Sequence, residues 1–182
     1  MNGGNEYPAL PALRSLGRLA DVRPVVIIDT REQAPLVFER LPSRRGTLST
    51  GDYSFSGGER VLVVERKSIA DLVACVTGER ERFERELERL RGFPFARLLV
   101  VGSVAEIERH EYRSAVSPSA VLHSLHAWEA RFVPVVFASC PREAARLVER
   151  WAYWNARAIV ERANALLRGS NETATEEELC KT

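Results

Sequence analysis

The sequence predicts an α/β fold in which a mixed central β-sheet is flanked by helices. Three observations lead to this prediction. Short apolar runs typical of buried strands alternate with amphipathic segments typical of helices. Two neighbouring runs of alternating residues frame a Gly-Gly pair and indicate a β-hairpin. Because the later strands are separated by helices, the sheet is expected to carry helices on both faces.

The composition is that of a globular protein and excludes several other classes. The 182 residues are 45% hydrophobic and 28% charged, which is enough for one domain with a buried core. The apolar runs fall far short of the roughly 20 residues of a membrane helix, and residues 1–23 lack the apolar centre of a signal peptide. We therefore expect no membrane association and an intracellular location, the cytoplasm or nucleoid of a prokaryote or virus-infected cell, or a eukaryotic nucleus. Three widely spaced cysteines argue against both a disulfide framework and a zinc site.

The N-terminal part contains a leader, a buried strand and a loop. Residues 1–23, with Gly3-Gly4, Pro8 and Pro11, are expected to be a flexible leader. The continuous apolar run 25–28 predicts a buried strand, which ends in the polar cluster 29–32. Residues 44–49 are predicted to be a loop.

The hairpin follows at 52–56 and 61–67, and strand parity divides its side chains between two faces. The register that best opposes the apolar residues pairs Phe55 with Leu62 and Tyr53 with Val64, which we expect to be the packed face. The other face carries Asp52, Ser54, Ser56, Val61, Val63, Glu65 and Lys67.

The remaining elements alternate helices with strands. Ser68 begins a helix, and Asp71 three residues later has the spacing of a capping box. Further helices are predicted at 79–91, 117–131 and 142–167, and strands at 97–101 and 134–138. The acidic residues 169–182 are expected to form a disordered tail.

The predicted register places Asp52 directly opposite Glu65. Two opposed carboxylates repel each other, so a positive charge is needed beside them. Lys67 on the same face is one candidate and a divalent cation is the other. Because no Cys or His shares the cluster, Mg²⁺ or Mn²⁺ suits it better than zinc. Asp29 and Glu32, at the end of the first strand, are placed to complete such a site.

Each of these residues also has a purely structural explanation. Asp52 after a glycine is a common turn residue, Glu65 and Lys67 are compatible with an exposed strand face, and residues 29–32 with an ordinary loop. Convergence weakens these explanations, because strand parity gathers four acids and one Lys on one side of one sheet, and some of them are of rare types. The 26 basic residues include only two Lys, and the 25 acidic residues only four Asp. Lys67, Asp29 and Asp52 belong to these rare types and gather on one side of one predicted sheet.

The motif residues occur in a recognisable order. Residues 65–71 read E-R-K-S-I-A-D, preceded by G-D-Y at 51–53 and D-T-R-E at 29–32. This order resembles the nuclease domain of the XPF family of structure-specific DNA endonucleases, whose hallmark is G-D followed by E-R-K-x-x-x-D. The resemblance covers roughly 24–157 and implies a restriction-endonuclease-like nuclease fold, with the nuclease domain at 24–168.

The resemblance also implies roles for individual residues in metal-assisted phosphodiester hydrolysis. Asp52, Glu65 and the backbone carbonyl of Arg66 would bind the catalytic Mg²⁺ or Mn²⁺. Asp29 and Glu32 would flank the metal or the attacking water, and Lys67 would orient or activate that water. Asp71 and Ser68 would support the site, and Arg31, Arg66 and Arg80 would be phosphate or scaffold contacts.

The resemblance finally implies partners. Family members usually carry a helix-hairpin-helix domain with Gly-rich hairpins after the nuclease, but the only Gly after Gly102 is Gly169, so we expect that domain to be absent. Recognition of branched or flapped DNA would then rest on the nuclease domain, a homodimer or a partner subunit. The apolar face of the helix at 142–167 suits either such an interface or packing on the sheet.

The expected function is that of a metal-dependent endonuclease acting on branched or flapped DNA in repair or recombination. The alternatives are a catalytically silent DNA-binding or scaffolding subunit with the same fold, and an interaction domain whose charges are solvated.

Overall fold

A computed structural model describes residues 22–179 of the chain. The contacts divide the chain into two units, one comprising residues 23–156 and the other residues 1–22 together with 157–182. The expected leader at 1–23 lies almost entirely outside the described residues.

The unit 23–156 is built on one mixed sheet of six strands. Their bounds are β1 Val26–Asp29, β2 Ser43–Gly46, β3 Tyr53–Phe55, β4 Leu62–Ser68, β5 Phe95–Val101 and β6 Val135–Ala138. The strand order is β2-β1-β3-β4-β5-β6. Strand β3 is antiparallel to both neighbours, whereas β1 and β2 pair in parallel, as do β4, β5 and β6. The mixed sheet expected from the sequence is confirmed.

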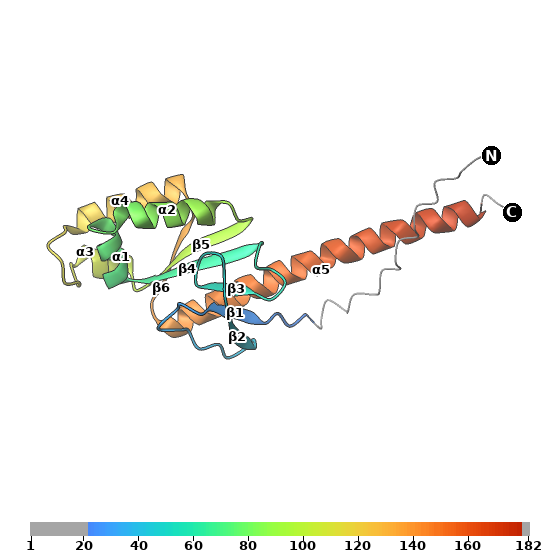
Figure 1. Cartoon of the computed structure of the whole chain (residues 1–182), viewed down its shortest axis with the longest axis horizontal. Helices are drawn as coiled ribbons and strands as arrows, with labels where there is room; N and C mark the ends of the chain where they lie inside the picture. Colours follow the sequence, from blue (N-terminus) through green and yellow to red (C-terminus); the bar gives the residue numbers. More distant parts are fainter. Residues whose placement is uncertain (1–21, 180–182) are drawn as a thin grey trace, which may run out of the picture. The chain divides into compact units, whose positions relative to one another are not determined.

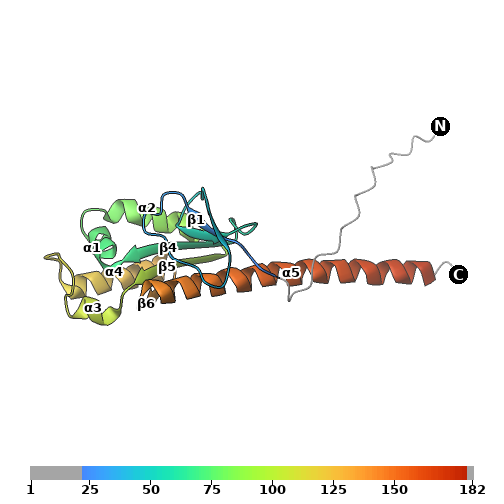
Figure 2. The ribbon, with the colours of Figure 1, turned by 90° about the horizontal axis from the view of Figure 1, so that it is seen from below.

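Helices cover both faces of this sheet. Their bounds are α1 Ile69–Val76, α2 Arg80–Arg91, α3 Val104–Glu108, α4 Pro118–Arg131 and α5 Pro141–Leu179. Within the unit 23–156, α1 and α2 lie over one face and the first turns of α5 over the other (Figures 1 and 2). Among the described helices, none combines the length and the apolar character needed to cross a bilayer.

Both faces of the hairpin are packed, although only one was expected to be. Val63, on the face of Asp52 and Glu65, is 1% exposed and belongs to a core cluster with residues of α1, α2 and α4. On the other face, the rings of Phe95 and Trp151 lie 5.8 Å apart and join β5 to α5. The polar side chains that share a face with Val63 therefore lie at the border of a core and not on an open surface.

Two elements were not predicted, and a third is longer than expected. Strand β2 lies where a loop was predicted; its sequence Ser-Arg-Arg-Gly is exposed at the sheet edge and is held to β1 by backbone pairing, which leaves no hydrophobic signal. The five-residue helix α3 was not predicted. Helix α5 continues to Leu179, past residue 167 and into the segment 169–182 that was expected to be disordered.

Gly51 is required where the chain enters β3. Its φ is +75°, and a Cβ atom there would lie 2.4 Å from Val63 Cγ2 and 3.2 Å from the Val64 carbonyl oxygen. The next amide, of Asp52, donates to that same carbonyl at 2.8 Å. The glycine thus lets the backbone approach β4 closely enough to fix the position of Asp52.

We expect Gly51→Ala to lower the free energy of unfolding by about 2 kcal/mol or more, because it combines a positive φ with a steric clash against a strand. Urea denaturation measures the change. The matched control is Gly78→Ala, where an added Cβ meets nothing within 4 Å. Equal stability of the two variants would contradict the close approach described here.

Candidate active site

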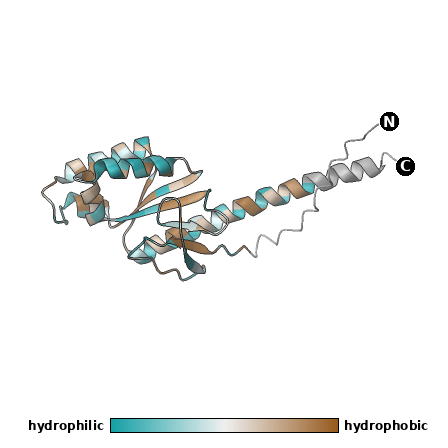
Figure 3. Ribbon diagram, in the orientation of Figure 1, coloured by the Kyte–Doolittle hydropathy of each residue, from teal (hydrophilic) through white to brown (hydrophobic). Residues whose placement is uncertain are grey.

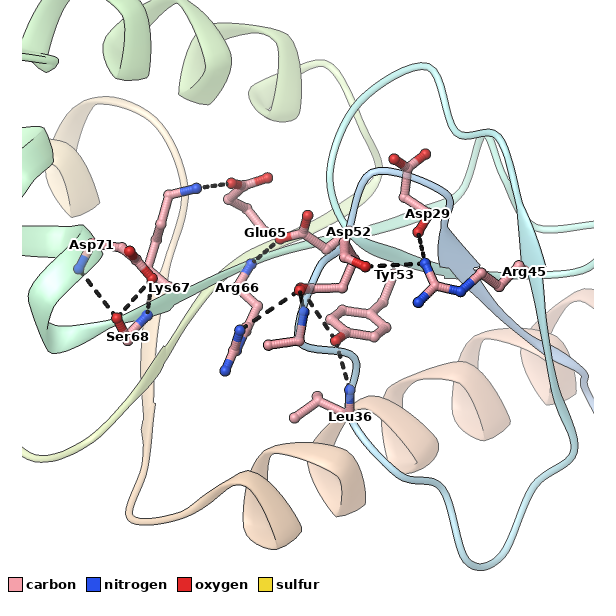
Figure 4. Close-up of polar contacts among 12 residues, drawn as sticks. Asp29, Leu36, Arg45, Asp52, Tyr53, Glu65, Arg66, Lys67, Ser68 and Asp71 are labelled. Carbon is pink, nitrogen blue, oxygen red and sulfur yellow. Dashed lines mark hydrogen bonds and ion pairs between the residues drawn. The ribbon is translucent and has the colours of Figure 1, made fainter.

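The hairpin of β3 and β4 brings Asp52 and Glu65 together. Tyr53 pairs with Val64, so the next residues outward, Asp52 and Glu65, oppose each other as the sequence predicts. The first half of β4 is hydrophobic and its second half hydrophilic, a change visible along the strand in Figure 3. The Asp52 carboxylate accepts a hydrogen bond from the Arg66 backbone amide at 2.8 Å, which orients it along β4 (Figure 4).

Lys67 supplies the positive charge beside this acid pair. Its ammonium forms an ion pair with Glu65 Oε1, with the two side chains 18% and 3% exposed. The same ammonium lies 5.3 Å from the centre of the Phe83 ring on α2. A buried ammonium held by a carboxylate and an aromatic ring is fixed in position, so its proton donors are available at one defined point.

Burial dominates the electrostatics of the three groups. It raises the pKa of Glu65, and the nearby Asp52 charge raises that pKa further, against the opposing effect of Lys67. Burial also raises the pKa of Asp52, against the hydrogen bond from the Arg66 amide and the charge of Lys67. For Lys67, burial alone would lower the pKa, but the contact with Glu65 outweighs it and raises the pKa. Burial and mutual repulsion therefore oppose the simultaneous ionisation of both carboxyl groups, and a cation bound beside them would favour their ionised forms.

Asp29 is engaged elsewhere. Its carboxylate accepts hydrogen bonds from the Arg31 amide at 2.9 Å, from Arg31 Nε at 2.6 Å and from the Leu48 amide at 2.7 Å. Burial would raise its pKa, but these hydrogen bonds lower it overall. Figure 4 shows the carboxylate away from Asp52 and Glu65. In this structure Asp29 fixes the loop after β1 and does not join the acid pair.

Glu32 is buried and is held by several donors. It accepts hydrogen bonds from the Ala34 amide at 2.7 Å and from the Tyr53 hydroxyl at 3.4 Å, and Arg66 Nη1 lies 3.8 Å from it. The Tyr53 hydroxyl in turn accepts the Leu36 amide at 3.0 Å. The buried Arg66 Nε has no hydrogen-bond partner among the described residues. The Arg66 guanidinium, which lies near Glu32, therefore retains a buried donor that no described residue satisfies.

Two basic residues that the sequence did not single out contribute to this region. Arg45 Nη1 donates to the carbonyl oxygens of Asp29, Thr30 and Glu32 at 3.3, 3.4 and 3.0 Å, and so holds the loop that follows β1 (Figure 4). Arg82, on an exposed turn of α2, lines the groove described below. Arg45 lies on the unpredicted strand β2, and Arg82 is one of many arginines in a charged helix, so neither gave a distinct signal.

The remaining predicted residues have clear local roles. The Ser68 hydroxyl accepts the Asp71 amide at 3.1 Å while the Asp71 carboxylate accepts from the Ser68 amide and hydroxyl, which is a complete capping box. Arg80 donates to Ser124 at 2.9 Å and pairs with Glu84 at 3.0 Å. Of the two roles left open for Arg80, the structure thus contains the scaffold contact, between α2 and α4.

Several of these side chains line one groove with a volume of about 440 Å³, and the buried Glu65 is not among its lining residues. Both acidic and basic groups line it, including Asp52, which directly precedes β3, and Lys67 of β4. The charged residues that line it are Arg31, Glu32, Asp52, Arg66, Lys67, Asp71, Glu79 and Arg82. A groove of this composition suits a phosphate group, because it offers both cationic contacts and oxygen ligands for a cation.

The donor set fits a hard divalent ion with few protein ligands. Within the described residues, no three or more His, Cys, Asp or Glu side chains gather into a metal-binding group. Asp52, Glu65 and the backbone carbonyl of Arg66, the residue that follows Glu65, offer oxygen ligands only. Mg²⁺ commonly binds through one or two carboxylates and retains several waters, so a site with these two carboxylates is compatible with it.

Comparisons with known proteins agree with this geometry. The model of the ERCC4 domain family matches residues 28–150. Among solved structures, the chain is similar to XPF from Aeropyrum pernix, with a TM-score of 0.59 and 20% sequence identity over 72% of this chain and 61% of that chain. This likeness shows the fold, and the chain spans less than two thirds of that protein's length. No curated protein matches the chain.

The raised pKa values of Asp52 and Glu65 predict an unusual pH dependence of stability without metal. A raised native pKa means that the folded state binds more protons than the unfolded state, so stability falls as pH rises above the ordinary carboxyl range. Lys67 does not change this trend below its own raised pKa. When the pH is raised from about 5 to about 8 in EDTA, the free energy of unfolding of the native chain should fall relative to that of Asp52→Asn. We expect the difference to change by about 1 kcal/mol in favour of Asp52→Asn.

Urea denaturation at the two pH values measures this difference. Glu108→Gln, which removes an exposed carboxylate at the end of α3, serves as the control and should follow the native chain. If the stability of the native chain and that of Asp52→Asn change equally between the two pH values, the electrostatic description is contradicted.

Proposed function

We propose that this chain, which belongs to the ERCC4 domain family, is a divalent-metal-dependent DNA endonuclease whose reaction takes place at the Asp52 and Glu65 pair. The observation that supports this proposal most directly is the pairing of the buried Glu65 with Asp52 and Lys67, at a groove lined by further cationic side chains. The alternatives considered above were a turn at Asp52, an exposed strand face at Glu65 and Lys67, and an interaction domain with solvated charges. None of them gives a reason for these charges to lie together.

The chemistry requires oxygen ligands, a positioned cation and a phosphate contact. A bound Mg²⁺ or Mn²⁺ would polarise the phosphoryl oxygen and lower the pKa of a bound water. Asp52, Glu65 and the Arg66 carbonyl would hold the ion. The Lys67 ammonium, fixed between Glu65 and the Phe83 ring, would orient the attacking water and offset charge on the phosphate.

The arginines of the groove would bind the DNA backbone on either side of the reacting phosphate. Arg66 lines the groove as well, with its Nη1 3.8 Å from Glu32, and this placement supports such a role. Arg31 and Arg82, both largely exposed, extend the same basic lining. Asp29 and Glu32 would act by fixing the loop that follows β1. Asp71 and Ser68 would fix the start of α1.

The proposal extends to substrate, domains and partners. We propose branched or flapped DNA, in repair or recombination, as the substrate. The nuclease domain would comprise residues 24–168, followed by an acidic tail at 169–182. The active assembly would be a homodimer or a complex with a partner subunit. On α5, Val148 and Ala152 are fully buried within the unit 23–156, which favours sheet packing for that part of its apolar face. A partner surface on α5 would have to use its exposed residues.

We expect the native chain with Mg²⁺ or Mn²⁺ to cut labelled flapped or four-way DNA. Asp52→Asn and Lys67→Ala should each lose at least about a hundredfold in rate, the loss typical of removing a metal ligand or a positioned proton donor. Lys67→Arg should also lose most activity, because a planar guanidinium does not replace a compact ammonium at a buried position. Gel analysis of linear, flapped and four-way substrates measures all variants, with Glu108→Gln as the control.

Equal cutting by the native chain and the Asp52 and Lys67 variants would refute the site. If no substrate is cut while DNA binding is retained, the chain acts as a scaffolding or DNA-binding subunit of the same fold.

Metal binding can be tested apart from catalysis. We expect Mg²⁺ at ten times its Kd to stabilise the native chain by about 1.4 kcal/mol near pH 8, through preferential binding to the folded state. Asp52→Asn should show little of this effect, because it removes one of the two carboxylate ligands. Denaturation with and without Mg²⁺ measures the difference, and equal stabilisation of both proteins would place the ion elsewhere.

A further inference from the structure

One side of helix α2 borders the groove at which the acid pair lies. The buried side of this helix is formed by Phe83, Leu87 and Leu90. On one flank of that buried side, Glu84 accepts a hydrogen bond from Trp128 Nε1 of α4 at 3.0 Å. On the opposite flank, Arg82 lines the groove. The flank of α2 that points away from α4 therefore faces the groove.

Glu86 lies on this flank, close to Lys67. It is one helical turn after Arg82 and three residues after Phe83, and residues at these spacings are neighbours on the surface of a helix. The Phe83 ring in turn has the Lys67 ammonium 5.3 Å from its centre. Glu86 is half-buried. Helical spacing thus places its carboxylate on the side of α2 where the ammonium lies.

The charge of Glu86 acts on the groups of the site. Burial would lower the pKa of Lys67, and the contact with Glu65 raises it most. The charge of Glu86 also raises that pKa, and does so more than the charge of Asp52. After Glu65, Glu86 is therefore the acid that attracts the Lys67 ammonium most strongly.

Glu86 forms no hydrogen bond or ion pair with another described residue. The other glutamates of α2 each pair with an arginine of the same helix; they are Glu81, Glu84 and Glu88. Arg82, one turn before Glu86, is held by Glu79. A half-buried carboxylate near two other acids is unfavourable unless a cation attracts it. The cation that its position offers is the ammonium of Lys67.

Lys67 needs a second partner if Glu65 binds a divalent ion. The two side chains pair in this structure, and Lys67 is only 18% exposed, so water has limited access to its ammonium. A bound divalent ion is the largest charge in such a site, and it would offset the attraction of Glu65 for the ammonium. A carboxylate on α2 can supply the attraction that Glu65 then no longer supplies.

A role of Glu86 as a further ligand of the same ion is less well supported. Across residues 22–179, no three or more His, Cys, Asp or Glu side chains converge on a point where one ion could be held. Asp52 and Glu65 therefore do not share an ion with Glu86 in this geometry. The position of Glu86 beside Phe83 favours contact with Lys67 instead.

We propose that Glu86 is a positioning residue that holds the Lys67 ammonium from α2 when the Glu65 carboxylate is engaged by a divalent ion. Lys67 would then keep its place between α2 and β4 and would still orient the attacking water. The part played by the ion rests on the proposed function, whereas the attraction between Glu86 and Lys67 does not.

NMR relaxation of the Lys67 side chain tests the inference without any DNA. The sequence contains only two lysines, so selective labelling of lysine with ¹³C gives the Lys67 signal and a reference signal from Lys181. In EDTA, Glu65→Gln removes the charge of the first partner, and we expect Lys67 to stay ordered. Adding Glu86→Gln should lower its order parameter below about 0.6, the range of a flexible group. The matched control adds Glu88→Gln, an exposed glutamate of the same helix, and should leave Lys67 ordered.

Saturating Mg²⁺ gives a second arm in which Glu65 is retained. Glu86→Gln should then lose the order of Lys67 with Mg²⁺ but keep it in EDTA, where Glu65 still holds the ammonium. Three results would overturn the inference. They are an ordered Lys67 in the chain that carries both Glu65→Gln and Glu86→Gln, a flexible Lys67 in Glu65→Gln alone, and an equal loss of order with Glu88→Gln.

DNA cleavage shows whether this positioning matters for the reaction. We expect Glu86→Gln to lower kcat about tenfold or more with little change in KM, since it acts through Lys67 and does not touch the DNA. Glu86→Asp keeps the charge and should restore part of the loss. If Glu86 only repelled the DNA backbone, Glu86→Gln would instead bind DNA more tightly without a loss in kcat, which would refute the inference.

The inference and the nuclease proposal can fail separately. If the order of Lys67 depends on Glu86 in the Glu65→Gln chain while the native chain cuts no DNA, the attraction between Glu86 and Lys67 stands and the nuclease proposal fails. If cutting requires Asp52 and Lys67 but neither cutting nor the order of Lys67 changes in the Glu86 variants, only the inference fails.

Discussion

The opposition of Asp52 and Glu65 across one hairpin is the constraint on which the rest of the site depends. Two carboxylates in a buried position repel each other, and a protein tolerates them only where other groups offset their charge. Here the backbone amide of Arg66 and the ammonium of Lys67 do so in part. The free-energy cost of ionising both carboxyl groups remains, and a divalent ion bound there would offset it.

The surroundings of the pair serve to keep it in place. Gly51 lets β3 approach β4, and the loop after β1 is tied down by the Asp29 carboxylate from one side and by Arg45 from the other. Phe83 of α2 closes over Lys67. Each of these contacts comes from a different element, so the sheet and its helices act as a frame for a few charged atoms at the end of β4.

The sequence predicted those features that arise from short-range pattern. Strand parity placed Asp52 opposite Glu65, and the spacing of Ser68 and Asp71 indicated the capping box. It did not predict β2, because an exposed edge strand is held by backbone pairing and carries no apolar period. The hydrogen bonds from Arg31 and Leu48 to the Asp29 carboxylate could not be predicted either. Leu48 lies 19 residues further along the chain, so its contact with Asp29 depends on how the intervening segment folds back. The metal and DNA roles of the site residues remain predictions.

The acid pair, Lys67 and the capping box all lie on one hairpin and the helix that follows it. Contacts between residues close in sequence lose little chain entropy when they form, so such a segment can organise early in folding. The geometry of the site is then set by local pairing before the distant strand β6 is added. Insertions between α3 and α4, or at other surface loops far from this segment, would lengthen the chain without moving the charged atoms relative to one another, which leaves the fold free to acquire new substrate contacts around an unchanged centre.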